Sequence, residues 1–129
     1  MEAATLDEST HTLLVVDDEP LITDLFRQFM TKRGYRVLTA TSGQQALATV
    51  EAEESIALVI TDMTMPEMNG LEIANRLAQL RPRLPVLIAT GHNTEDALAN
   101  LPPNVVGIVQ KPFQNKLLAE RIHEILALG

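Results

Sequence analysis

The feature that most constrains the fold is a set of four apolar runs, each of which ends at a charged or hydroxyl side chain. LLVV is followed by Asp17 and Asp18, LVIT by Asp62, VLIA by Thr90, and VVGIVQ by Lys111. Short apolar runs of this kind are typical of strands that a parallel sheet buries on both faces. Because ligands bind at the carboxyl edge of such sheets, the pattern predicts one site built from these residues.

Strand and helix patterns alternate from residue 12 to the end of the chain. Strands are predicted at residues 13–16, 35–40, 57–61, 85–89 and 105–109. Helices are predicted from Pro20 to Gly34, from the capping pair Ser42 and Gln45, from Asn69 with Glu72, and over about 94–100 and 114–127. Five strands alternating with five helices indicate an α/β fold, a flavodoxin-like doubly wound parallel sheet of order 2-1-3-4-5. Strands one and three flank its switch point, so their terminal carboxylates are expected to meet.

Apolar residues at helical spacing predict which side of each helix is buried. The expected buried positions are Leu21, Leu25, Phe29 and Met30 in the first helix, Ile73, Ala74 and Leu77 in the third, and Leu118, Ile122, Ile125 and Leu126 in the last. The stripe of the last helix could also offer an edge to a homodimer or another partner. Residues 1–11 lack such periodicity and are predicted to be a mobile tail or linker, which leaves 12–129 as the domain.

Composition excludes several classes of function. The 129 residues fit a single domain, and their net charge of −7 argues against direct binding of nucleic acid. No apolar run is long enough for membrane insertion, and no basic, apolar leader begins the sequence. The absence of cysteine rules out disulfides and thiolate metal sites and fits a cytoplasmic location.

The chemistry of the predicted site follows from its charges. Three carboxylates in one cleft repel each other, and a hard divalent cation such as Mg²⁺, or Mn²⁺ in its place, resolves that repulsion with oxygen ligands. Lys111 adds a fixed positive charge and Thr90 a short hydroxyl donor, both suited to the oxygens of a phosphoryl group. Asp62 stands alone at its strand end before a Met/Pro/Asn/Gly loop, which makes it the best candidate nucleophile.

Four segments together make the chain resemble a known family. VVDDEP, TDMTMPEMNG, LIATGH and VQKPF resemble the receiver domain of two-component response regulators, over about residues 12–128. The resemblance implies that Asp62 is the phosphoacceptor for a partner's phosphohistidine, supplied by a sensor histidine kinase or a histidine phosphotransfer protein. It implies Mg²⁺ ligands in Asp17, Asp18, Asp62 and the main-chain carbonyl of Thr64. Thr90 would be the switch hydroxyl, and Lys111 the phosphate-binding lysine.

One position departs from the family pattern. The fifth strand usually carries an aromatic switch residue three positions before the lysine, and here that position is Ile108. The usual relay from hydroxyl to aromatic ring is therefore not expected, whereas phosphoryl acceptance is. The chain could act as a switch or as a phosphorelay intermediate. It ends at Gly129, directly after the last predicted helix, so no output domain is expected in this chain.

Other interpretations compete with this one. A phosphohydrolase with an aspartyl nucleophile would be expected to carry D-x-D after its first strand and a cap insertion, whereas this chain has adjacent acids and no insertion. An interaction module that only borrows the fold would be expected to have lost Asp62 or Lys111. Met63, Met65 and Met68 could suggest a soft-metal site, but packing is the better interpretation without His or Cys among them. We therefore expect a signalling domain that assists its own phosphorylation and dephosphorylation, and not a metabolic enzyme.

Overall fold

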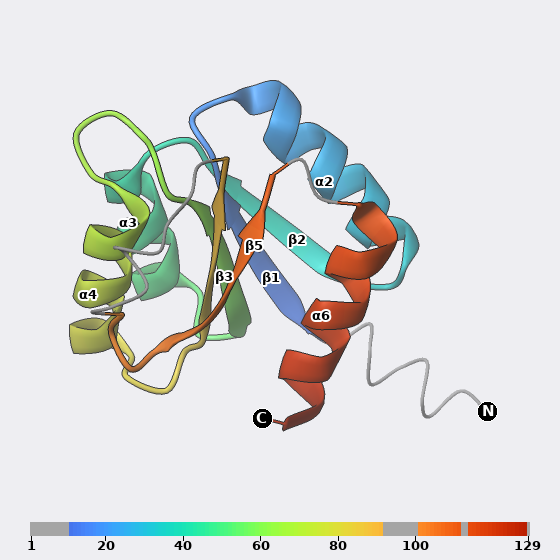
Figure 1. Cartoon of the computed structure of the whole chain (residues 1–129). Coiled ribbons are helices and arrows are strands. Elements are labelled where there is room, and N and C mark those ends of the chain that lie inside the picture. Colours follow the sequence, from blue (N-terminus) through green and yellow to red (C-terminus); the bar gives the residue numbers. More distant parts are fainter. Residues whose placement is uncertain (1–10, 92–100, 112–113, 129) are drawn as a thin grey trace.

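The fold was analysed in a computed structural model that describes residues 11–91, 101–111 and 114–128. Its strands are β1 (Thr12–Val16), β2 (Arg36–Ala40), β3 (Ile56–Asp62), β4 (Val86–Thr90) and β5 (Val105–Gln110). They form one parallel sheet of order β2-β1-β3-β4-β5 (Figure 1). The α/β class, the parallel pairing and the strand order predicted from the sequence are confirmed.

Helices cover both faces of the sheet. The described residues hold α2 (Pro20–Lys32), α3 (Gly43–Ala52), α4 (Gly70–Leu80) and α6 (Asn115–Leu128). In Figure 1, α2 and α6 lie on one face and α3 and α4 on the other. The fourth predicted helix, at about 94–100, and residues 1–10 of the predicted tail lie outside the described residues. No helix within the described ranges has the length and hydropathy needed to cross a membrane.

Consecutive residues of the central strands enter two different cores, which explains their unbroken apolar sequences. In β1, Leu13 and Val15 pack toward α2 and α6, whereas Leu14 and Val16 pack toward α3 and α4. The strands β3 and β4 alternate in the same way. A strand buried on both faces has no place for a charged side chain along its length. Its first charged residues can therefore stand only where it ends, at the edge of the sheet.

The buried side of α2 differs in part from the prediction. Met30 is buried and Phe29 is half-buried, as expected, but Leu21 and Leu25 are 66% and 55% exposed, and the helix instead buries Thr23 and Phe26. Burial of a threonine in place of two leucines is made tolerable by a local bond, because its hydroxyl donates to the carbonyl of Pro20 at 3.0 Å. The prediction was wrong for Leu21 and Leu25 because two apolar rows run along this helix, and packing against the sheet, not hydrophobicity, selected between them.

Both predicted helix caps on the other face are confirmed. Ser42 Oγ accepts from the Gln45 amide at 3.1 Å, and Asn69 Oδ1 accepts from the Glu72 amide at 2.8 Å. Each bond satisfies an amide that the first helical turn leaves without a partner. The caps set where α3 and α4 begin, and both beginnings lie close to the loop that follows β3. The buried Ile73, Ala74 and Leu77 of α4 agree with the prediction.

Candidate functional site

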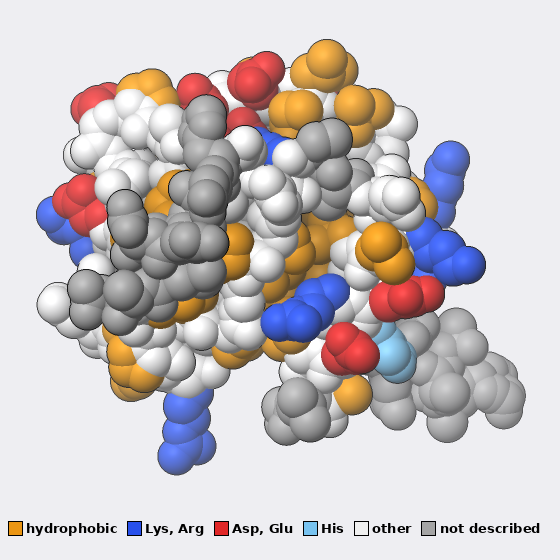
Figure 2. Space-filling model, in the orientation of Figure 1, with side chains coloured by type: hydrophobic (Ala, Val, Ile, Leu, Met, Phe, Trp, Pro, Cys, Tyr) orange, Lys and Arg blue, Asp and Glu red, His pale blue; other side chains and the backbone are white. Residues whose placement is uncertain are grey.

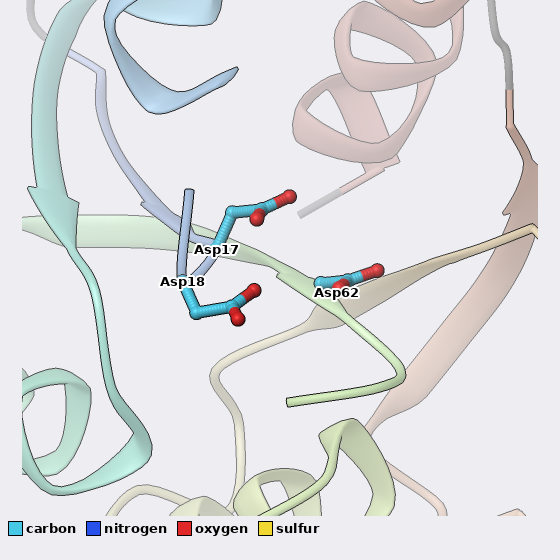
Figure 3. A group of neighbouring side chains, drawn as sticks. All are labelled: Asp17, Asp18 and Asp62. Carbon is cyan, nitrogen blue, oxygen red and sulfur yellow. The ribbon is translucent and has the colours of Figure 1, made fainter. Parts of the chain in front are cut away.

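The strand ends bring the three predicted carboxylates together. β1 pairs with β3 so that Val16 lies opposite Thr61, and the next residues are Asp17 and Asp62. Asp17, Asp18 and Asp62 each offer a carboxylate oxygen, and these oxygens all lie within 4.8 Å of one another. Figure 3 shows the three side chains extending from the ends of these strands into the same space. The predicted meeting of these residues at the sheet edge is confirmed as geometry.

The three carboxylates differ in burial. Asp17 is 3% exposed, and its Oδ1 accepts from the amide of Glu19 at 3.0 Å. That bond is local to the turn before α2 and holds the side chain in one orientation. Asp62 is half-buried, and Asp18 is exposed. The site therefore has an inner acid, an intermediate one at the end of β3, and an outer one toward solvent.

Lys111 joins the carboxylates of two strands. Its amide donates to the Thr90 carbonyl at 2.7 Å, which continues the pairing of β5 with β4. Its Nζ lies 3.1 Å from Asp17 Oδ2 and 3.0 Å from Asp62 Oδ1. Asp17 thus uses one oxygen for the Glu19 amide and the other for Lys111. The lysine offsets one of three negative charges, so the cluster keeps a net negative charge that suits a cation.

Burial and neighbouring charges shift the pKa values of Asp62 and Lys111. Burial raises the pKa of Asp62; Lys111 opposes that rise, while Asp17 and Asp18 add to it. Burial works to lower the pKa of Lys111, but its hydrogen bonds to Asp62 and Asp17 and their charges raise it overall. The two directions therefore have different main causes: burial makes Asp62 harder to ionise, whereas the neighbouring carboxylates help Lys111 to keep its proton.

Thr90 and Thr64 occupy the expected parts of this edge, although their functional roles stay predictions. Thr90 ends β4 and is buried, one residue beyond Ala89, the partner of Asp62 across the sheet. Thr64 is exposed, two residues after Asp62 in the loop that follows β3. Its main-chain carbonyl is expected to complete the metal ligands.

The loop at residues 63–69, here called the acceptor loop, is fastened at both ends. The Met63 amide donates to the Ala89 carbonyl, and the Gly70 amide donates to the Met63 carbonyl, each at 2.8 Å. Gly70 approaches so closely that a Cβ atom there would lie 2.8 Å from the Asp62 carbonyl oxygen. Sequence reasoning recognised Asn69 as a cap but missed this role of Gly70. The glycine after the cap was its only local signal.

Two further predictions about packing can be compared with the structure. Met65 and Met68 are buried in the core beneath α3 and α4, which confirms packing as the interpretation of the methionine cluster. Ile108 is half-buried against the same core and presents an aliphatic side chain where an aromatic ring is usual.

Comparisons with known proteins agree with the fold and identify similar sequences. The family model described as "Response regulator receiver domain" matches residues 13–123. The transcriptional regulatory protein GlrR of Escherichia coli is 35% identical over 115 residues, which cover 88% of this chain and 26% of that protein. The alkaline phosphatase synthesis transcriptional regulatory protein PhoP of Bacillus subtilis is 32% identical over 115 residues, which cover 88% of this chain and 48% of PhoP. The chain thus spans half or less of the length of these relatives.

Solved structures share the same architecture. A response regulator receiver domain protein from Clostridium thermocellum superposes with a TM-score of 0.83 at 30% identity, covering 91% of this chain and 94% of that one. The response regulator TrrA from Thermotoga maritima, solved in complex with Mg²⁺-BeF, superposes with a TM-score of 0.80 at 28% identity, covering 89% and 98%. The similarity extends over about nine-tenths of the chain.

Proposed function

Because the chain belongs to the response regulator receiver domain family, we propose that it accepts a phosphoryl group from a partner's phosphohistidine onto Asp62. The observation that carries the proposal is the position of the Asp62 carboxylate. It lies 3.0 Å from the Lys111 ammonium and within 4.8 Å of oxygens from Asp17 and Asp18. A nucleophile, a cation for phosphoryl oxygens and two further carboxylates thus share one edge of the sheet.

The donor set fits Mg²⁺ or Mn²⁺. Both are hard cations that prefer oxygen ligands, and the cluster offers only carboxylates, without the nitrogen or sulfur donors that favour zinc or copper. Asp17, Asp18, Asp62 and the main-chain carbonyl of Thr64 would hold the metal. When bound, it would supply charge neutralisation for the phosphoryl oxygens. Receiver domains in general bind Mg²⁺, and the excess negative charge of this site supports the same dependence here.

The transfer step uses the protein's own groups in defined roles. A carboxylate oxygen of Asp62 attacks phosphorus, the new P–O bond forms, and the P–N bond to the partner histidine breaks. The electron pair of that bond leaves with the imidazole, which takes a proton. Lys111 stabilises charge on the equatorial phosphoryl oxygens, and Thr90 donates a hydrogen bond to one of them. Attack of water on phosphorus later breaks the P–O bond, restores the carboxylate and releases phosphate.

The partner is proposed to be a sensor histidine kinase or a histidine phosphotransfer protein in the cytoplasm. The two leucines of α2 support a protein donor, because neighbouring apolar side chains exposed on one helix can form the contact surface for a protein partner. Leu21 and Leu25 lie one turn apart on the helix that begins three residues after Asp17. Figure 2 shows hydrophobic side chains on the surface near α2, with acidic side chains beside them. A partner that docks there would bring its histidine to the site.

The domain is proposed to be a switch or a phosphorelay intermediate, not a metabolic enzyme. It would take part in its own phosphorylation and dephosphorylation, but it would not turn over a diffusible substrate. With Ile108 at the position of the aromatic switch, the phosphorylated state would act through other surfaces or pass the phosphoryl group on. The last helix could supply one such surface, including one for a homodimer.

The deciding experiment is intact mass after incubation with a small acyl phosphate, with and without Mg²⁺. Wild type should gain the mass of one phosphoryl group only when Mg²⁺ is present. Asp62→Asn, which keeps the size of the side chain and removes the nucleophile, should gain none while retaining its circular dichroism spectrum. Equal labelling of the two proteins would refute Asp62 as the acceptor. Continuous release of phosphate from a generic phosphate ester would instead favour a phosphohydrolase.

A further inference from the structure

The acceptor loop contains a strained turn. Glu67 has a φ of 70°, in the left-handed region that residues other than glycine rarely adopt. The amide of Met68 donates to the carbonyl of Pro66 at 2.7 Å, two residues back, so that the bond closes a three-residue turn around Glu67. A turn of this hand is uncommon, and it persists only where the surroundings enforce it. Some neighbouring group must therefore hold this part of the loop.

The side chain of Met68 is the link to such a group. It is 9% exposed and enters the core between α3 and α4 together with Met65. It also lies directly against Gly43, the first residue of α3. A Cβ atom added at Gly43 would lie 2.6 Å from Met68 Sδ, 3.0 Å from its Cβ and 3.1 Å from its Cγ. Any side chain larger than hydrogen at position 43 would therefore push Met68.

The three distances show which atoms of Met68 would have to move to make room for a Cβ atom at position 43. The sulfur stands at the end of a flexible side chain and could rotate away at little cost. The Cβ atom is fixed to the backbone, so it moves only if residue 68 itself moves by a few tenths of an ångström, and Cγ moves only if the buried side chain rotates about χ1. Residue 68 closes the turn at Glu67, and Asn69 next to it caps α4. A displacement there would therefore change the middle of the loop, whose two ends are fixed to Ala89 and Gly70.

We propose that Gly43, remote in sequence and without any group of its own in the site, is a positioning residue for the acceptor loop. Hydrogen at this position lets Met68 seat against α3, the seated Met68 holds the strained turn, and the turn fixes the segment that includes Thr64. The inference rests on the proposed function, because the position of the acceptor loop matters only if Thr64 and Asp62 serve the metal and phosphoryl site. It makes the first turn of α3 part of the support of the phosphoryl and metal site.

The test is an alanine at position 43, read by Mg²⁺ affinity and by thermal melting. Calorimetric titration with MgCl₂, far below the melting temperature, should show that Gly43→Ala weakens Mg²⁺ binding by about tenfold, the lower end for residues that orient metal ligands. The melting temperature should fall, although Gly→Ala in a first helical turn without steric conflict normally raises it. Gln44→Ala, at an exposed neighbouring position of α3, should change neither quantity.

A double variant separates positioning from general destabilisation. Met68→Ala removes the Sδ and Cγ atoms that a Cβ at position 43 would meet and leaves only Met68 Cβ, so Gly43→Ala should cost less Mg²⁺ affinity when added to Met68→Ala than it costs on its own. Additive losses in the double variant would overturn the proposal, as would an unchanged Mg²⁺ affinity in Gly43→Ala. Failure of the proposed function looks different, because wild type itself would then neither gain phosphate mass nor bind Mg²⁺.

Discussion

The ends of β1 and β3 contribute to the same site but are held by different means. After β1, the chain turns into α2 within three residues, and Asp17 is oriented by the amide of Glu19. After β3, seven residues pass before α4, and the acceptor loop depends on buried methionines, a close glycine and a strained turn. A short turn can be held by its own hydrogen bonds, whereas a long loop needs packing from the rest of the fold.

The largest expected effect comes from the group that joins the two ends. Lys111→Ala should slow phosphorylation by a small acyl phosphate by about 100-fold, because an ammonium aimed at developing phosphoryl charge is lost. Mg²⁺ affinity should persist or rise, since removing a cation beside three carboxylates favours a second one. Rates from intact mass and affinities from calorimetry check both parts. Loss of Mg²⁺ binding in this variant would mean that Lys111 organises the carboxylates themselves.

The exposed leucines beyond the β1 end should matter only to a protein donor. Leu21→Gln with Leu25→Gln should slow transfer from the cognate phosphohistidine protein by about tenfold, as expected for losing apolar contacts in an interface. Uptake from a small acyl phosphate should stay unchanged, because the site is intact. Leu80→Gln, at an exposed leucine that ends α4, is the matched control. If transfer from the phosphohistidine protein and from the small acyl phosphate slowed equally, the leucines would affect the phosphorylation site itself and not the docking of the donor protein.

Charge at the β3 end should lower stability in the absence of metal. The raised pKa of Asp62 means that the folded state disfavours its ionised form, so stability should fall as pH rises through the window between its ordinary and folded values. Asp62→Asn should therefore raise the melting temperature at neutral pH by about 2–4 °C. Addition of Mg²⁺ should also raise the melting temperature of Asp62→Asn by less than it raises that of wild type. Thermal melts of both proteins from pH 4 to 8 check this. If the difference between their melting temperatures did not shrink at low pH, the prediction would be contradicted.

Strain in the acceptor loop should be measurable by relieving it. Glu67→Gly removes a side chain from a left-handed backbone position and so relieves strain in the folded state. We expect this stabilisation to exceed the destabilisation that comes from the greater conformational entropy of glycine in the unfolded chain. The melting temperature should rise by about 1–3 °C. Glu19→Gly, in the short turn after β1 where the backbone is extended, should lower it. A decrease in both variants would show that the loop is no more strained than the turn.

The smallest effect is expected at Ile108. Ile108→Tyr should change the rate of phosphoryl uptake by less than about twofold, because this side chain packs against the core beneath α3 and α4 and not among the carboxylates. The same mass measurement that follows Lys111→Ala would detect a change. A large loss would move position 108 into the site and weaken the view that only strand ends and the acceptor loop build it.

The sequence by itself determined the sheet and the place of the charged groups. Strands that are apolar on both faces leave polar residues only at their ends, and parallel pairing gathers those ends at one edge. Right-handed crossovers between the strands predicted the order of the sheet. With that order, the runs Leu13 to Val16 and Leu58 to Thr61 predicted the meeting of Asp17 with Asp62. Caps at Ser42 and Asn69 were equally predictable, because their hydrogen bonds are local.

Only the tertiary structure decided which apolar row of α2 is buried and what holds the acceptor loop. Thr23 is buried while Leu21 and Leu25 are exposed, since contact with the sheet and not residue hydrophobicity sets the rotation of the helix. The contact of Gly43 with Met68 joins residues far apart in sequence, and its only sign there is a glycine. Periodicity and capping report local energy, whereas the fit of one side chain against a distant backbone exists only once the chain has folded.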